Sequence, residues 1–124
     1  MAVTTGTTWD IVLSNEPVTT TLAPRSAISP RAAYQAALYG RATLVDLRTP
    51  RQRDRDGELS AEVATAVVDR LELGVWLRES LASRIVLLDD DGARAGRLSA
   101  GSDPRLTSVE GGFAGWVAAG LPTA

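Results

Sequence analysis

A run of three aspartates is the densest group of reactive side chains in this sequence. It follows the apolar run 85–88 and continues as Asp89, Asp90, Asp91, Gly92, Ala93 and Arg94. Aspartate carboxylates can hold a divalent cation, attack as nucleophiles or accept hydrogen bonds from backbone N–H groups. The chain has no cysteine and no histidine, which excludes disulfides, thiolate metal sites, a sulfur nucleophile and an imidazole base.

The overall composition restricts the classes of partner. The 124 residues suffice for one domain, and 44% hydrophobic with 23% charged residues is typical of a globular protein. Fifteen acidic and 13 basic residues give a net charge of −2, so we expect no nucleic-acid partner. No apolar run is long enough for a signal peptide or a membrane span, and we therefore expect a cytoplasmic protein without membrane contact.

The chain divides into an arm and a domain. Residues 1–24 are rich in threonine and show no helical period, although Trp9, Ile11 and Leu13 alternate as in a short edge strand. Residues 25–124 carry regular patterns throughout and are expected to form a single domain.

Strand and helix patterns alternate through this domain. The apolar and β-branched runs predict strands over residues 43–48, 64–68, 85–88 and 106–109. Helical spacing predicts helices over residues 30–39, 51–56, 73–79, 94–100 and 113–119. Ser29 and Pro30 are typical of a helix start and Gly40 of a helix end, and the last helix places Phe113, Trp116 and Val117 on one face. Such alternation predicts an α/β layer fold with a mainly parallel sheet.

Three segments of the domain resemble the rhodanese-like family. Residues 44–48 (LVDLR) with Pro50 resemble the family's LVDVR-x-P strand end, and residues 57–59 (GEL) lie where the family has GHIPGA. Residues 109–122 (VEGGFAGWVAAGLP) are similar to its LEGG-x-x-x-W-x-x-x-G-L-P signature. The resemblance implies a three-layer sandwich with about five mainly parallel strands flanked by helices.

The resemblance also implies where the site lies. The family's active loop reads C-x-x-G-x-R-S after the fourth strand, so Gly92 and Arg94 take its glycine and arginine positions, and Asp89 takes the position of the sulfur-carrying cysteine. The resemblance places Asp46, Arg48 and Glu58 nearby as supporting residues, with Glu58 where the family has histidine.

An aspartate at this position changes the expected chemistry. A carboxylate cannot form a persulfide, so we expect no sulfurtransferase activity, no cofactor and no metal. Asp89 can accept the loop N–H bonds and be favoured by the helix dipole. A small anion ~4 Å from one of these carboxylates would meet repulsion of about 4 kcal/mol per charge pair at an effective dielectric near 20. The sequence therefore predicts a binding or regulatory module whose partner is another protein.

Other interpretations stay open. The acidic run can be only a solvated turn, or the chain can be a subunit of a sulfurtransferase system that uses a partner's cysteine. Asp-x-Asp-Gly after an apolar strand also resembles the first motif of the haloacid-dehalogenase-like phosphatases, which implies Asp89 as nucleophile, Asp91 as acid/base and Mg²⁺ as cofactor. Only residues 92–124 follow the motif, and they lack the lysine and the further acidic pair of that family.

Two further features have alternative explanations. Gly111 and Gly112 could hold a phosphate or permit close packing of a helix. Trp76 is expected in the core, and an exposed position would instead indicate a contact surface.

Overall fold

Four parallel strands form the centre of the structure, a computed structural model that describes residues 27–63 and 65–124. They are β1 (Thr43–Asp46), β2 (Thr65–Val67), β3 (Ile85–Leu88) and β4 (Leu106–Ser108). Their order across the sheet is β2-β1-β3-β4, and every neighbouring pair is parallel. All residues of β3 are buried, as expected of a central strand covered on both faces.

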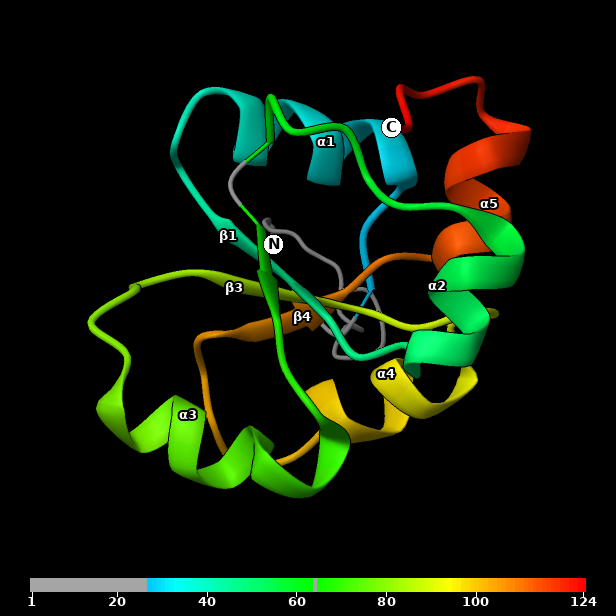
Figure 1. Ribbon diagram of the computed structural model, residues 1–124. Coiled ribbons are helices and arrows are strands. Elements are labelled where there is room, and N and C mark those ends of the chain that lie inside the picture. The colour runs from blue at the N-terminus through cyan, green and yellow to red at the C-terminus, as the bar shows by residue number, and fades with distance from the viewer. Residues whose placement is uncertain (1–26, 64) are drawn as a thin grey trace, which may run out of the picture.

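Helices cover both faces of this sheet (Figure 1). They are α1 (Pro30–Leu38), α2 (Pro50–Asp56), the 3-10 helix η3 (Arg70–Glu72), α3 (Leu73–Glu79), α4 (Ala93–Ser99) and α5 (Gly112–Ala118). Helices α1 and α5 lie on one side of the sheet, and α3 and α4 lie on the other. The predicted three-layer α/β architecture is therefore confirmed.

The predicted number of strands is wrong, because the described residues form four strands and not five. Among the described residues, the side of β4 opposite β3 carries one isolated parallel bridge, between Ile28 and Val109. Its hydrogen bonds run from the Ile28 N–H to the Ser108 carbonyl (2.7 Å) and from the Glu110 N–H to the Ile28 carbonyl (2.8 Å). The next residue is Ser29, the N-cap of α1, so the chain leaves the sheet at once.

The boundaries of α1 follow from its sequence. The Ser29 hydroxyl accepts a hydrogen bond from the Ala32 N–H, and Pro30 occupies a first-turn position that needs no donor. At the other end Gly40 has a φ of 71°, and the N–H groups of Gly40 and Arg41 bond back to carbonyls of the last turn. The helix therefore begins and ends where its cap residues predict.

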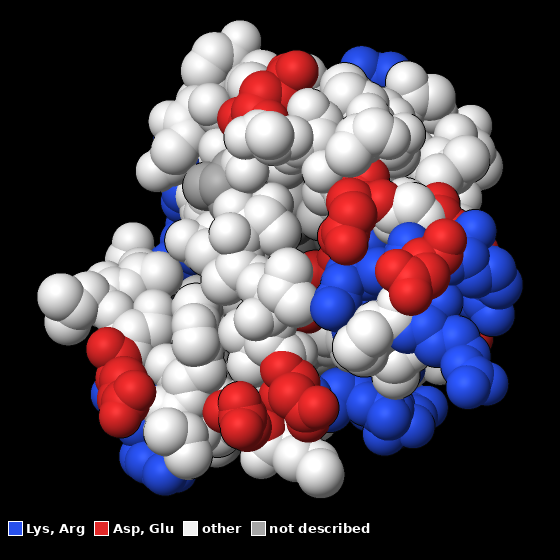
Figure 2. All heavy atoms as spheres, viewed as in Figure 1, with Lys and Arg blue, Asp and Glu red and all other residues white. Residues whose placement is uncertain are grey.

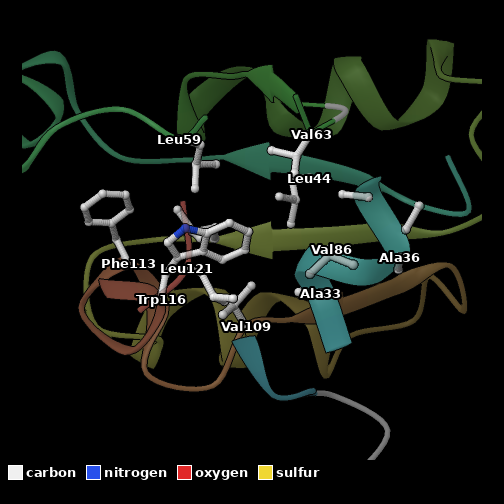
Figure 3. Packing of buried hydrophobic residues seen from close by; sticks show 13 residues of the cluster. Ala33, Ala36, Leu44, Leu59, Val63, Val86, Val109, Phe113, Trp116 and Leu121 are labelled. Carbon is white, nitrogen blue, oxygen red and sulfur yellow. The ribbon is translucent and has the colours of Figure 1, made fainter. Parts of the chain in front are cut away.

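Trp116 is the largest side chain of the core and is fully buried (Figure 3). Its ring lies among Leu44, Val86 and Val109, and its indole N–H donates to the Pro122 carbonyl at 2.9 Å. The first two come from the sheet and the third from the segment after β4, so the tryptophan fixes α5 against that face.

The shared face of Phe113, Trp116 and Val117 on α5 is only partly buried. Phe113 and Trp116 are buried, but Val117 is 53% exposed. Positions 113, 116 and 117 are three and four residues apart, so they share one face of this short helix. Val117 lies at the exposed margin of that face, where it lines a surface hollow with Phe113 and Ala114.

The predicted threonine-rich arm and its edge strand at Trp9 to Leu13 lie outside the described residues. Within the described part of the chain, no helix has the length and apolarity that crossing a membrane requires.

Candidate functional site

The site lies where the connections of the sheet diverge. From β1 the chain passes to β2 at one edge, and it then returns to β3 on the other side of β1. In parallel α/β sheets, ligands bind in the crevice outside the carboxyl ends of the strands at such a point. Here that crevice is a pocket of about 250 Å³ lined by residues that follow β1, β2 and β3: Leu47, Thr49, Gln52, Arg70, Asp89, Asp90, Asp91, Ala93, Arg94 and Arg97.

The Asp89 carboxylate occupies a ring of backbone donors at the base of this pocket. Its Oδ1 accepts from the Gly92 N–H at 2.6 Å, and its Oδ2 accepts from the N–H groups of Arg94 and Ala95, both at 3.0 Å. The residue is only 5% exposed. Three donors, two of them in the first turn of α4, compensate the desolvation of this buried carboxylate. The expectation that Asp89 satisfies its own loop is confirmed; repulsion of small anions stays a prediction.

The loop is held from below by the start of α5. The N–H groups of Phe113 and Ala114 donate to the carbonyls of Asp89 (2.8 Å) and Asp90 (3.1 Å). Gly112 has a φ of 58°, and a Cβ at that position would lie 2.6 Å from the Asp89 carbonyl oxygen. The glycine pair of the sequence therefore permits close packing of α5 against the loop, which was one of the two explanations for it.

The outer two aspartates make fewer contacts. Asp90 is half-buried, and its Oδ2 accepts from the Gln52 side-chain amide at 3.1 Å. Asp91 is exposed, and its Oδ1 accepts from the Ala93 N–H at 2.9 Å. Both keep acceptor capacity on the solvent side of the pocket.

Helix α2 positions Gln52 through its own cap. The Thr49 hydroxyl accepts from the Gln52 N–H at 3.1 Å, and the Gln52 side-chain oxygen accepts from the Thr49 N–H at 2.9 Å. This reciprocal capping box leaves the Gln52 amide nitrogen free to reach Asp90. The Thr-Pro-Arg-Gln spacing in the sequence contained this signal, although it was not used to find the residue.

Three arginines line the same pocket. Arg94 was predicted from the loop motif, whereas Arg70 on η3 and Arg97 on α4 were not. All three are exposed, and none makes an ion pair with another described residue. The lining contains three arginines and three aspartates, so its formal charge sums to zero. Figure 2 shows arginines gathered on the right of the molecule, beside α2 and toward α4.

Asp46 and Arg48 form a buried pair beneath the loops and do not line the pocket. The Arg48 guanidinium donates to both Asp46 carboxylate oxygens, from Nε at 3.0 Å and from Nη2 at 2.8 Å. It also donates to the Gly57 carbonyl at 2.8 Å and lies 3.8 Å from the centre of the Phe113 ring. The pair therefore ties the ends of β1 and α2 to α5.

Glu58 lies away from the pocket. Its carboxylate is half-exposed and is 3.5 Å from the Arg53 Nε, and its backbone carbonyl accepts from the Ala124 N–H. The structure thus brings together Asp89, Asp90, Asp91, Ala93 and Arg94 around the pocket, with Gly92 forming the turn beside them, and leaves the other three predicted residues outside it.

The geometry of the three aspartate carboxylates does not support the phosphatase interpretation. One carboxylate oxygen from each of Asp89, Asp90 and Asp91 lies within 4.8 Å of the others, a spacing that could surround a cation. Both oxygens of Asp89, however, already accept backbone hydrogen bonds, and the side chain is 5% exposed. A nucleophilic aspartate needs an oxygen directed at the substrate, so this geometry gives no support for phosphoryl transfer.

Several solved structures share this fold. A rhodanese-related protein from Thermoplasma volcanium is 19% identical with a TM-score of 0.60, covering 80% of this chain and 97% of its own. A homodimeric polysulfide-sulfur transferase from Wolinella succinogenes is 24% identical with a TM-score of 0.63, covering 83% and 80%. A possible tyrosine phosphatase of unknown function from Rhodopseudomonas palustris is 23% identical with a TM-score of 0.63, covering 80% and 84%.

No family model matches the sequence, and no curated protein matches it. The structural likeness and the arrangement of the loop nevertheless agree with the sequence resemblance. This chain is a variant of the rhodanese-like fold that contains no cysteine and has Asp89 seated in the backbone ring of its β3–α4 loop.

Proposed function

We propose that this protein is a non-catalytic rhodanese-like domain that acts as a binding or regulatory module, with the Asp89–Arg94 loop as a contact for a partner protein. The observation that carries the proposal is the Asp89 carboxylate, whose two oxygens accept three backbone N–H bonds at 2.6 to 3.0 Å. In a sulfurtransferase, donors of this kind stabilise a thiolate and its persulfide. A carboxylate satisfies the donors equally well but cannot carry sulfur.

The outer part of the pocket supports a contact role. Arg94 and Arg97 are exposed beside the remaining acceptor capacity of Asp90 and Asp91. A surface with both charge signs suits a protein partner that offers both, whereas a small anion would still meet the three aspartates that line the pocket.

Two assays test the proposal. The purified full chain is expected to form no thiocyanate from thiosulfate and cyanide, and measurable turnover would overturn the non-catalytic assignment. For the contact role, the tagged chain is purified from its native host and its co-purifying proteins are quantified by mass spectrometry. A partner should be lost with Arg94→Gln and retained with Arg31→Gln, which removes an exposed arginine on α1.

The partner-cysteine interpretation predicts a different result. A complex of this chain with its partner would then transfer sulfur, and the partner's cysteine would carry a persulfide. Activity of the partner that is unchanged when this chain is omitted would remove that interpretation.

A further inference from the structure

A second concave surface runs beside β2, away from the Asp89 pocket. It is a shallow groove of about 380 Å³, lined by Val67, Val68, Glu72, Val75, Trp76 and Glu79. The first two residues come from β2 and the position after it, and the other four come from η3 and α3. We refer to this surface as the β2 groove.

The β2 groove lies in the most exposed apolar region of the described chain. Seven large apolar side chains of the described residues are exposed, and four of them lie between positions 67 and 81: Val67, Leu71, Val75 and Leu81. Trp76 is half-buried, with part of its ring packed against the core cluster of Val45, Leu73 and Leu87. Such clustering of apolar surface around an anchored tryptophan is typical of protein-contact sites. Trp76 thus belongs partly to the core and partly to this surface.

The backbone beside the groove is an open sheet edge. Strand β2 is the last strand in the order β2-β1-β3-β4, so only its β1 side is paired among the described residues. Successive residues of an extended chain face opposite sides of a sheet, and the groove touches both Val67 and Val68. It therefore follows the edge of the strand, where N–H and C=O groups are available for an added strand.

The negative charge of the β2 groove favours a basic occupant over an acidic one. Glu72 and Glu79 are its only charged lining residues. A second copy docked through the same surface would bring both glutamates of each copy together. The chain's own segment before Arg25 carries Asp10 and Glu16 and no basic residue, so its charge does not complement the groove either.

We propose that the β2 groove binds an extended segment of another protein in which apolar residues alternate with basic ones. The segment adds as a strand beside β2, its apolar side chains cover Val67, Val75 and Trp76, and its basic side chains pair with Glu72 and Glu79. This proposal does not depend on the Asp89 loop, because no residue of the groove lines that pocket.

A synthetic probe tests the groove directly. A fluorescein-labelled nine-residue peptide that alternates valine with lysine is titrated with the full chain, and binding is followed by fluorescence anisotropy. Two comparison peptides carry glutamate in place of lysine, or serine in place of valine. The basic-apolar peptide is expected to bind, and both comparison peptides are expected to bind at least about tenfold more weakly.

Matched variants locate the contact. Val75→Asp should weaken the peptide about tenfold or more, whereas Val117→Asp should not, although both valines are exposed on seven-residue helices. Glu72→Gln combined with Glu79→Gln should weaken it by roughly 2- to 30-fold, as expected for two exposed ion pairs. Glu62→Gln combined with Glu110→Gln makes the same change of net charge at exposed positions outside the groove and should leave the affinity unchanged.

Hydrogen exchange decides the binding mode. Bound peptide should slow amide exchange at Thr65 and Val67 of β2, and it should leave α5 unchanged. Equal affinity for all three peptides, binding unaffected by Val75→Asp, or binding without protection of β2 would each overturn the proposal. So would concentration-dependent dimerisation abolished by Val75→Asp, or a gain in affinity after deletion of residues 1–24, because a second copy or the chain's own segment would then be the occupant.

Discussion

Replacing Asp89 by asparagine should destabilise the fold strongly, although the two side chains have the same size and shape. An asparagine has only one acceptor oxygen. If that oxygen takes the Oδ2 place it keeps the bonds from Arg94 and Ala95, but its amide N–H₂ then faces the Gly92 N–H, whose present bond is 2.6 Å long. The opposite orientation loses two bonds instead of one.

The magnitude follows from these contacts. Losing one hydrogen bond to a charged acceptor costs about 1.5 to 3 kcal/mol, and the retained bonds weaken because their acceptor becomes neutral. We therefore expect the free energy of unfolding to fall by about 2 to 4 kcal/mol. Urea unfolding of the full chain, followed by far-ultraviolet circular dichroism, measures this change in the transition midpoint.

Asp91→Asn is the control for this measurement. It removes the same charge from the same loop, but Asp91 is exposed and accepts one bond, from the Ala93 N–H. It should change the free energy of unfolding by less than about 1 kcal/mol. The control also corrects for the repulsion among neighbouring aspartates that either substitution relieves. A loss of less than about 0.5 kcal/mol for Asp89→Asn would refute the argument that the backbone donors depend on this carboxylate.

Two further predictions concern the Asp89 loop, and a third concerns the ion pair between Asp103 and Arg105 before β4. Gly112→Ala places a Cβ 2.6 Å from the Asp89 carbonyl oxygen and should lower the free energy of unfolding by about 3 kcal/mol or more. The control Gly120→Ala, at a residue with a φ of 73° and no atom within 4 Å of the added Cβ, should lower it by only about 1 to 2 kcal/mol. Similar losses for both variants in urea unfolding would contradict the close approach of Gly112 to the loop. Asp89→Cys should gain a persulfide on incubation with polysulfide, seen by mass spectrometry as one added sulfur atom, because the backbone ring would then face a thiolate. Arg105 donates hydrogen bonds that lower the pKa of Asp103 below its ordinary 3.8, so this pair contributes stability above the ordinary pKa and loses it as the pH falls through the lowered value. The difference in free energy of unfolding between the wild type and Asp103→Asn should therefore shrink on acidification. A difference that does not change with pH would exclude this linkage.

The fold could be predicted closely from the sequence because its signals are local. The Ser29-Pro30 start of α1, its Gly40 end and the apolar run of β3 each reflect forces within a few residues, and the structure has these elements where the patterns place them. The expected fifth strand is absent from the described residues. Ile28 forms only one bridge, to Val109 just after β4, because the next residue, Ser29, already caps α1, and sequence patterns do not show how far a segment pairs before a helix begins.

The candidate site was predictable only in its consecutive part. The loop from Asp89 to Arg94 is one segment, so a motif could identify it. Arg70 and Gln52 reach the same pocket from segments that follow other strands, and their positions depend on the strand order β2-β1-β3-β4. Glu58 was placed near the site by its position in the segment that resembles GHIPGA, but its side chain pairs with Arg53 and does not line the pocket.

The backbone N–H groups around Asp89 restrict which side chains can occupy position 89. A ring of backbone N–H groups favours any anion that fits it, and a buried donor without an acceptor is costly. Replacing a thiolate by an uncharged side chain would leave the donors of Gly92, Arg94 and Ala95 unsatisfied, whereas a carboxylate satisfies all three. Under the proposed function, aspartate at position 89 thus satisfies the loop donors without carrying sulfur, and the arginines of the pocket surface are available for contact with a partner.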